Sequence, residues 1–424
     1  MEKFIIYGGK PLNGDITVSG SKNATLGILP AVLLAENPCI IENVPDILDV
    51  KIIVDMLTAL GAKCAWMSKN VIKIDPRNVK SHKAISESIS TLRGSYYFIG
   101  ALLGRFGKAE VSLPGGCNLG PRPIDLHLKG FNALGADTVE EYGMVKTNAK
   151  KGLKGTSIYL DGVTVGATIN LMLAASRAEG NTIIENCARE PHVVDVANFL
   201  NAMGANIKGA GTDTIRIKGC KEIKGGITYS IIPDQIEAGT FMVAAAATKG
   251  DVTLRNIIPR HQESLTAKLQ EMNVGIEEGD DYIRVFHKGR MNGANVKTLP
   301  YPGFPTDMQP QITALLSLAD GDSVVSEGIW DRFQYVDELK RMGAMIKVEG
   351  RTAYITGNRK YKGTFVKCTD LRAGAALVIA ALASEGRSDV YNIKYIDRGY
   401  DGFEKKLAQL GADIHRVKAE EFPI

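Results

Sequence analysis

The chain carries little net charge and few cysteines or tryptophans, and it contains no long apolar run. Its 424 residues have a formal net charge of +4. A charge this small argues against a broad nucleic-acid-binding face, although it leaves room for a local basic pocket. No apolar run reaches the roughly 18–20 residues of a membrane span, and the opening MEKFIIYGGKPLNGD lacks the apolar core of a signal peptide. We therefore expect a cytoplasmic protein with no nucleic-acid or membrane partner.

The cysteines are too scattered for a disulfide framework or a zinc site. No two of them form a CxxC pair, and the histidines show no metal-ligand or catalytic-triad spacing. We predict no metal and no cofactor. Five cysteines are interpreted as small buried hydrophobic residues, namely Cys39, Cys64, Cys187, Cys220 and Cys368. Cys117 is the exception, because the stretch LPGGCNLGPRP surrounds it with turn-forming residues.

Internal repetition is the strongest organisational signal in the sequence. The end of an amphipathic helix, a C-cap and a strand follow one another in LTALGAKC, FNALGADT, LNAMGANI, LQEMNVGI, LKRMGAMI and LAQLGADI. The cap residues recur about every 70 residues, at Gly61, Gly135, Gly204, Asn273, Gly343 and Gly411. Glycine suits the left-handed backbone that ends a helix, and asparagine is its usual substitute. The sequence therefore predicts six copies of one unit.

Each unit is predicted to have the order β-α-β-α-β-β. Its first helix is rich in small residues, as in VGATINLMLAAS and IEAGTFMVAAAA, so we expect these helices to be buried inside a ring of sheets. Because 424 residues exceed the usual size of a single core, the units divide into two α/β domains of three, with a hinge near YSIIPDQIEAGT. The first strand precedes the first helix, and we expect it to pair with the sixth unit.

Charged and polar side chains recur at the predicted helix starts. Lys22 and Asn23 open a helix of the first unit, Arg93 precedes one in the second, and Asp370 and Arg372 open one in the sixth. Further arginines stand before the second helices, at Arg122, Arg189, Arg260, Arg332 and Arg398. Helix N-termini attract anions, and cations there add charge-assisted hydrogen bonds. These arginines are either solvated surface residues or, as their recurrence favours, the lining of an interdomain pocket for a small, multiply anionic substrate.

Asp307, in PGFPTDMQ, is an acidic residue at a predicted helix start, where most of the other charged residues are arginines. One interpretation makes it an N-cap residue, but Thr306 already offers a capping hydroxyl at this helix start. A carboxylate among cations has a lowered pKa and stays ionised. The alternative interpretation is therefore a base that accepts a proton from an attacking hydroxyl group.

Six motifs together resemble one known family. They are SGSKNATLGILP, PGGC with RPIDLHLKG, EPHVVDVANFLNAMGA, YPGFPTDMQ, TDLRAGAALVIAAL and YIDRGYDGFEKKLAQLGA. The sequence resembles the UDP-N-acetylglucosamine 1-carboxyvinyltransferase family from about Tyr7 to Val417. The resemblance implies transfer of enolpyruvyl from phosphoenolpyruvate to the sugar 3-hydroxyl, with release of phosphate. It also implies two similar inside-out α/β-barrel (prism) domains with an interdomain active-site cleft.

The domain boundaries follow from the repeats and the resemblance. We expect residues 22–231 to form the first domain, which carries the Cys117 loop, and residues 1–21 and 232–424 to form the second. The partners would be the two small-molecule substrates, and the protein would be a monomer or a weak oligomer.

The resemblance also implies the site residues. Cys117 matches the family cysteine that supplies the proton to C3, and Asp307 matches the carboxylate beside the sugar hydroxyl. Lys22, Asn23 and Arg122 match contacts of phosphoenolpyruvate. Its anionic groups would also be held by Arg398, Arg332 and Arg372. The UDP-sugar would be lined by Arg93, Arg122, Pro123, Ile124, Asp125, Leu126, Gly162, Val163, Thr164, Val165 and Ile329. Asp370 matches an acid that helps proton movement or domain closure.

Some positions depart from the family pattern. The segment GIWDRFQYV is one residue shorter than usual before Arg332, Pro121 stands where a small residue is common, and Gln235 replaces a common arginine.

The sequence leaves two other functions open. A 3-phosphoshikimate 1-carboxyvinyltransferase would show a GSKS opening and no loop cysteine, unlike the GSKN and Cys117 found here. A catalytically weak paralogue that only binds UDP-sugar would show no phosphate release.

Overall fold

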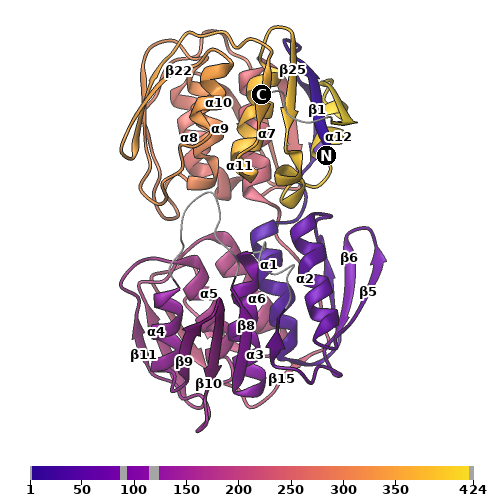
Figure 1. The fold of residues 1–424 in the computed structure, drawn as a ribbon, viewed down its shortest axis with the longest axis vertical. Helices are drawn as coiled ribbons and strands as arrows, with labels where there is room; N and C mark the ends of the chain where they lie inside the picture. Colours follow the sequence, from indigo (N-terminus) through magenta and orange to yellow (C-terminus); the bar gives the residue numbers. More distant parts are fainter. Residues whose placement is uncertain (1, 86–92, 114–123, 420–424) are drawn as a thin grey trace. The chain divides into compact units, whose positions relative to one another are not determined.

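The computed structural model describes residues 2–85, 93–113 and 124–419, and the chain divides into two compact units. The continuous unit is Gly20–Ile232, and the split unit combines Met1–Ser19 with Pro233–Ile424. Each unit buries its own apolar cluster. In both units the helices lie inside and strands lie at the margin (Figure 1).

Three helices form the centre of the continuous unit, and α3 contacts both α1 and α5. These helices are α1 (Lys22–Ala31), α3 (Tyr97–Phe106) and α5 (Val165–Ala175). The second helices of the repeats are α2 (Leu48–Ala59), α4 (Asp125–Ala133) and α6 (Pro191–Met203). The sheet orders are β16 (Thr228–Ser230)–β4 (Cys39–Glu42)–β6 (Val71–Asp75)–β5 (Lys63–Ser68), β7 (Lys83–Ala84)–β8 (Lys108–Ser112)–β10 (Met144–Asn148)–β9 (Asp137–Glu141) and β11 (Ser157–Tyr159)–β12 (Asn181–Glu185)–β14 (Thr214–Lys218)–β13 (Asn206–Lys208). A two-stranded sheet joins β3 (Ala35–Asn37) to β15 (Ile223–Gly225).

The split unit repeats this plan, with α7, α9 and α11 in mutual contact at its centre. These helices are α7 (Gln235–Ala247), α9 (Gln309–Leu316) and α11 (Leu371–Leu382). The second helices are α8 (Glu263–Glu271), α10 (Val336–Arg341) and α12 (Phe403–Gln409). The sheet orders are β18 (Gly275–Glu278)–β19 (Tyr282–Phe286)–β17 (Asp251–Arg255)–β2 (Asn13–Thr17), β20 (Val296–Lys297)–β21 (Ser323–Ser326)–β23 (Thr352–Thr356)–β22 (Met345–Glu349) and β24 (Phe365–Lys367)–β25 (Arg387–Tyr391)–β1 (Glu2–Tyr7)–β26 (Asp413–Lys418).

The first strand closes the last repeat, as expected from its place ahead of the first helix. Strand β1 lies between β25 and β26 and is antiparallel to both, with Phe4 opposite Val390 on one side and Arg416 on the other. Strand β2 is parallel to β17. The split unit therefore needs residues from both ends of the chain to complete two of its sheets.

The predicted helix ends are confirmed by the backbone. Five glycines and Asn273 occupy the predicted cap positions, all with φ between 65° and 111°, at Gly61, Gly135, Gly204, Asn273, Gly343 and Gly411. This left-handed conformation lets each chain reverse out of its helix into a strand.

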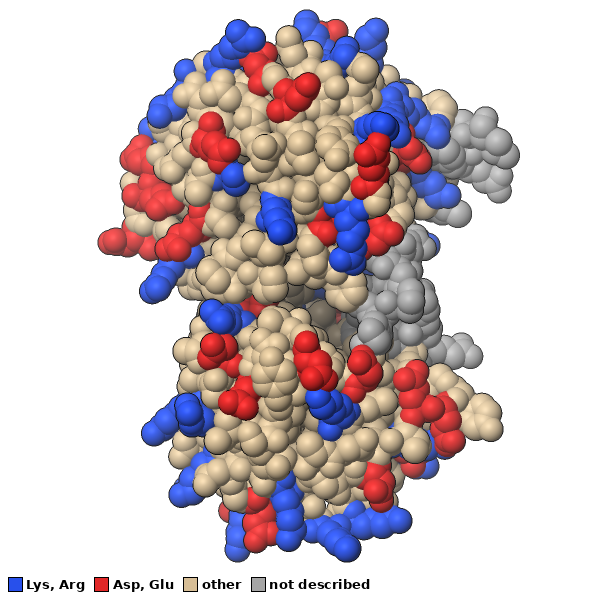
Figure 2. All heavy atoms as spheres, turned by 90° about the vertical axis from the view of Figure 1, so that its left-hand side faces the viewer, with Lys and Arg blue, Asp and Glu red and all other residues tan. Residues whose placement is uncertain are grey.

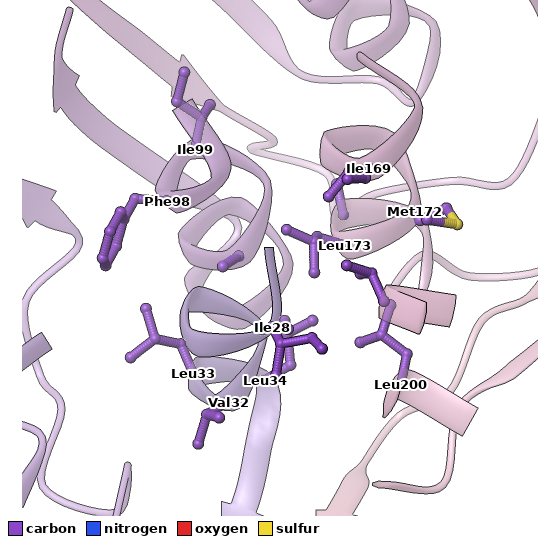
Figure 3. Packing of buried hydrophobic residues seen from close by; sticks show 14 of the residues in the cluster. Ile28, Val32, Leu33, Leu34, Phe98, Ile99, Ile169, Met172, Leu173 and Leu200 are labelled. Carbon is purple, nitrogen blue, oxygen red and sulfur yellow. The ribbon is translucent and has the colours of Figure 1, made fainter. Parts of the chain in front are cut away.

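Close helix packing explains the small residues of the central helices. In α3, a Cβ atom on Gly100 would lie 2.3 Å from the backbone oxygen of Asn170 in α5. Larger side chains fill the layer between these helices and their neighbours, among them Ile28, Phe98 and Leu173 (Figure 3). The expected burial of the first helices is therefore confirmed.

The cysteines depart partly from expectation. All five in the described residues are free thiols, and Cys39, Cys187 and Cys368 are buried, whereas Cys64 and Cys220 are partly exposed. These two lie on or beside the sheet strands β5 and β14, where one side of the sheet is open to solvent.

None of the helices among the described residues combines the length and hydropathy needed to cross a membrane. Acidic and basic side chains are interspersed on the face of each unit shown in Figure 2.

Candidate active site

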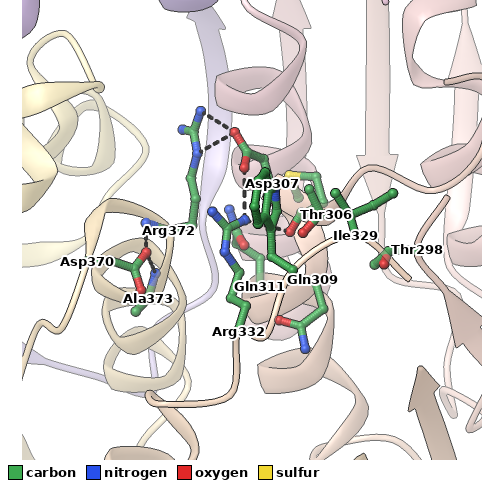
Figure 4. A network of polar contacts seen from close by, with 12 residues as sticks. Thr298, Thr306, Asp307, Gln309, Gln311, Ile329, Arg332, Asp370, Arg372 and Ala373 are labelled. Atoms are coloured by element: carbon green, nitrogen blue, oxygen red, sulfur yellow. Dashed lines mark hydrogen bonds and ion pairs between the residues drawn. The ribbon is translucent and has the colours of Figure 1, made fainter. Parts of the chain in front are cut away.

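A carboxylate held between two arginines is the central feature of the split unit. Asp307 lies in η5 (Thr306–Met308), a short 3₁₀ turn that leads into α9. Its Oδ1 accepts a hydrogen bond from Nη1 of Arg332 at 2.8 Å, and its Oδ2 accepts from Nη2 of Arg372 at 3.1 Å (Figure 4). Both arginines are buried, whereas about a quarter of the Asp307 side chain, 26%, is exposed. The carboxylate is therefore fixed in direction and still accessible.

The two guanidinium groups keep unused hydrogen-bond donors. Burial lowers the pKa of Arg372, but Asp307 and Tyr400 outweigh this effect and hold that pKa above its ordinary value. Nε of Arg332 and Nη1 of Arg372 are buried and have no hydrogen-bond partner among the described residues. Buried, unpaired donors on charged groups are costly, which makes them suitable for binding an anion.

Asp370 holds the start of the helix that carries Arg372. It is the N-cap of α11, and its Oδ1 accepts from the backbone N–H groups of Arg372 at 2.9 Å and Ala373 at 3.1 Å. A cap of this kind fixes the first turn of a helix. Asp370 therefore acts on the cluster through the backbone of Arg372.

The predicted capping role of Thr306 is wrong. The residue at the N-cap position of α9 is Met308, which makes no side-chain cap bond. The hydroxyl of Thr306 instead donates to Oε2 of the buried Glu327 at 3.0 Å. The 3₁₀ turn shifts the start of α9 past Asp307, so neither Thr306 nor Asp307 is needed as a cap.

Several polar residues around the cluster were missed by the sequence analysis. Gln311 of α9 donates to the hydroxyl groups of Thr240, at 3.2 Å, and Tyr400, at 3.4 Å. The ring of Tyr400 lies under the Arg372 guanidinium, 5.4 Å from its centre. The one available signal was a glutamine two residues into a buried helix, because such a side chain must find a partner.

In the continuous unit, Lys22 opens α1 as predicted and is paired with a residue that the sequence analysis did not single out. Its Nζ lies 2.8 Å from Oδ2 of Asp49 in α2, and the two side chains are only 10% and 2% exposed. Asn23, the next residue of α1, is half-buried. Lys22 thus presents a shielded positive charge at the first turn of a central helix.

Two further segments proposed for the UDP-sugar lie at the starts of neighbouring helices. Residues 124–126 begin α4, where Ile124 is buried, Asp125 exposed and Leu126 half-buried. Residues 162–165 lead into α5, with Thr164 at its N-cap. The buried ring of His127 joins them, because it lies beside Gly166 and its Nδ1 is 3.0 Å from Nδ2 of Asn170. Burial lowers the pKa of His127 to about 4, so this ring is neutral at pH 7.

The other predicted residues differ in their surroundings. Arg398 ends η6 (Ile393–Arg398) and is half-buried, and Ile329 is half-buried in the turn before Arg332. Arg189 and Arg260 are not in such a cluster: Arg189 is 45% exposed and 3.6 Å from Asp213, and Arg260 is exposed. Both side chains are open to solvent, which is compatible with either alternative.

Cys117, Arg122 and Pro123 lie outside the described residues, as does the side chain of Arg93. Within the described part of the chain, no group of three or more His, Cys, Asp or Glu side chains could hold a metal ion.

A family model and a solved structure show the broad class of proteins to which this chain is similar. The family model for EPSP synthase (3-phosphoshikimate 1-carboxyvinyltransferase) matches residues 6–407. The crystal structure of the enolpyruvyl transferase NikO from Streptomyces tendae superposes with a TM-score of 0.89 at 25% sequence identity, covering 99% of each chain. The expected two-domain inside-out α/β fold is thereby confirmed.

Two curated relatives show the family within this class to which the chain belongs. UDP-N-acetylglucosamine 1-carboxyvinyltransferase 3 of Caldanaerobacter subterraneus subsp. tengcongensis is 57% identical and aligns over 99% of this chain and 100% of its own length. UDP-N-acetylglucosamine 1-carboxyvinyltransferase of Clostridium botulinum is also 57% identical, over 98% of this chain and 100% of its own. The chain belongs to the UDP-N-acetylglucosamine 1-carboxyvinyltransferase family, within the EPSP synthase class.

Proposed function

We propose that the chain transfers the enolpyruvyl group of phosphoenolpyruvate to the 3-hydroxyl of UDP-N-acetylglucosamine and releases inorganic phosphate, the first committed step of peptidoglycan synthesis. The observation that carries the proposal is 57% identity, over 99% of the chain, to a relative named for this activity. The sugar oxygen adds to C2 while C3 gains a proton. Loss of phosphate from C2 and of a proton from C3 then restores the double bond.

Asp307 is the proposed base for the sugar 3-hydroxyl. Two guanidinium groups favour its ionised form, and its partial exposure leaves it within reach of a substrate. The spare donors of Arg332 and Arg372 support binding of the carboxylate or phosphate of phosphoenolpyruvate. Proposed contacts of the same substrate are Lys22, Asn23, Arg122 and Arg398. Orientation and anion binding would provide most of the rate enhancement.

Cys117 is the proposed acid that gives C3 its proton. An unperturbed thiol has a pKa near 8.5, so it is mostly protonated at neutral pH and can act as an acid. General acid catalysis is worth about 10²–10⁴ in rate. The proposed UDP-sugar contacts are Arg93, Arg122, Pro123, Ile124, Asp125, Leu126, Gly162, Val163, Thr164, Val165, Ile329 and Asp307. Asp370 is proposed to help proton movement or domain closure.

Phosphate release tests the proposal directly. We expect phosphate from a mixture of the protein, UDP-N-acetylglucosamine and phosphoenolpyruvate, and none when 3-phosphoshikimate replaces the UDP-sugar. The variant Cys117→Ser should lose at least 10²-fold in kcat, whereas Cys117→Asp should retain measurable turnover, because a carboxyl group can also carry the proton. Cys220→Ser is the matched control and should turn over like the unmodified protein.

Three outcomes would contradict the proposal. Release that depends on 3-phosphoshikimate would indicate the other activity of this class. No release with either acceptor would indicate a protein that only binds UDP-sugar. Full activity of Cys117→Ser would remove the thiol from the mechanism.

The cellular setting is proposed on the same basis. We propose that the protein acts in the cytoplasm as a monomer or weak oligomer, with its two substrates as its partners. Five free thiols in the described residues fit a reducing compartment. Equilibrium sedimentation would measure the oligomeric state.

A further inference from the structure

We propose that Glu327, a buried carboxylate without an assigned role, is a positioning residue that holds the turn before Arg332 and the segment of Thr306 and Asp307 in their working arrangement. The inference rests on the proposed function for its kinetic consequence only. Glu327 follows β21 and is 3% exposed. Among the described residues no hydrogen bond joins it to Asp307, and it acts through Thr306 and the turn that leads to Arg332.

Within the described residues, every hydrogen bond of the Glu327 carboxylate comes from an uncharged donor. Oε1 accepts from the Thr298 hydroxyl at 2.5 Å and from the backbone N–H groups of Ile329 at 2.9 Å and Trp330 at 3.2 Å. Oε2 accepts from the hydroxyl of Thr306 at 3.0 Å. A buried carboxylate is tolerated only when its lone pairs are satisfied, and here four donors converge on it.

The first segment organised in this way is the turn that leads to Arg332. Gly328 donates its N–H to the Thr298 hydroxyl at 2.8 Å, while the next two N–H groups bind Glu327. Three successive backbone donors are thus satisfied by two side chains. Glu327 and Thr298 therefore supply the acceptors that define the shape of this turn.

The second segment contains Asp307 itself. Thr306, the residue before it, is fixed by its hydroxyl to Glu327. Arg332 returns to the same place, because its Nη1 donates to the Thr306 carbonyl and to Oδ1 of Asp307, both at 2.8 Å. The segment 327–332 is therefore attached to residues 306–307 at both of its ends, through Glu327 to Thr306 and through Arg332 to Asp307. Figure 4 shows the second of these contacts.

A glutamine can make the same contacts and a leucine cannot. The side-chain oxygen of glutamine accepts from the same donors as Oε1, and its amide N–H can donate to Thr306, whose hydroxyl is also an acceptor. Leucine removes all acceptors and leaves two hydroxyls and two N–H groups unsatisfied. A displacement of about 1 Å near reacting groups can lower a rate about 10²-fold.

Steady-state kinetics of Glu327→Gln and Glu327→Leu, at a temperature where both are folded by circular dichroism, test the proposal. We expect Glu327→Leu to lower kcat about 10–100-fold and to change the KM for phosphoenolpyruvate less, because the proposed base is misdirected. Glu327→Gln should stay within about 3-fold of the unmodified protein. Asp389→Leu is the control: its carboxylate binds Lys3 and Arg387 on β1 and β25, and its loss should lower the melting temperature without lowering kcat.

A fluorescence measurement separates failure of this inference from failure of the proposed function. The chain has two tryptophans, Trp66 and Trp330, so Trp330 is the only one in a Trp66→Phe background. There, Glu327→Leu should shift the emission maximum and increase acrylamide quenching, whereas Glu327→Gln should change neither. Unchanged emission in the leucine variant overturns the proposal whether or not the protein is active. Equal kinetic loss in both variants overturns it as well, because charge and not hydrogen-bond geometry would then matter.

Discussion

At Asp307, one carboxylate divides its two oxygen atoms between two buried guanidinium groups. For Asp307→Asn we predict a loss of about 10²-fold or more in kcat, the range of general base catalysis. The KM for UDP-N-acetylglucosamine should change less than 10-fold, because the amide can still accept one hydrogen bond. Steady-state kinetics with both substrates varied measure the two values. Equal losses in kcat and in UDP-sugar affinity would make Asp307 a binding group only.

Residues at helix starts were predictable, but their partners were not. Lys22, Asp370 and Arg372 lie at the first turns where the sequence pattern placed them. The pairing of Lys22 with Asp49 and the contacts of Glu327 depend on which repeat elements pack together. Short-range patterns report the local backbone, whereas side-chain pairing over tens of residues is decided by tertiary packing.

At the scale of elements, the helix ends follow local chemistry and one helix start does not. Glycine or asparagine at the six caps was predictable because a left-handed residue excludes most side chains. The start of α9 was not, because the 3₁₀ turn at Thr306 has no distinct sequence signal and its hydroxyl binds Glu327. The Thr306 hydroxyl could either cap the helix or bind Glu327, and only the tertiary structure determines which of the two contacts forms.

A second element-scale feature is the attachment of strand β16 to helix α6. Asp195 of α6 accepts hydrogen bonds from the hydroxyl of Tyr229 at 2.5 Å and from the N–H of Ile232 at 3.2 Å. Burial, partly opposed by these bonds, raises the pKa of Asp195 to about 6. The folded state therefore binds the proton more tightly than the unfolded chain between about pH 4 and 6, so stability falls as pH rises through this window.

Melting curves from pH 4 to 7 test this linkage. We predict that the unmodified protein loses up to about 3 kcal/mol relative to Asp195→Asn as the pH rises. Asp213→Asn removes the same charge from an exposed position and should follow the unmodified protein at every pH. Parallel curves for the protein and Asp195→Asn would contradict the prediction.

At the scale of the whole molecule, the two units differ in how the chain builds them. Residues 20–232 contain every described strand of the continuous unit, whereas the split unit lacks β1 and β2 without residues 1–19. We predict that a fragment of residues 20–232 unfolds cooperatively and that residues 233–424 alone do not fold. Strand β1 is interior to its sheet, so its loss leaves two strands without a partner on that side.

A rearranged chain is the control for this prediction. Glu2 is paired with Lys418, so a short linker can join the end of the chain to its beginning. Residues 233–424 followed by residues 1–19 should regain a cooperative thermal transition, measured by circular dichroism. Cooperative unfolding of residues 233–424 without this addition would contradict the role given to β1.

The split order of the chain also bears on its synthesis. During translation, residues 20–232 emerge as a complete set of repeats and can fold while the ribosome is still working. Residues 2–7 are made long before the strands on both sides of them, β25 and β26. Strand β1 must therefore wait without its neighbours while the intervening repeats are made, so the last sheet of the split unit can be completed only after β26 has been synthesised.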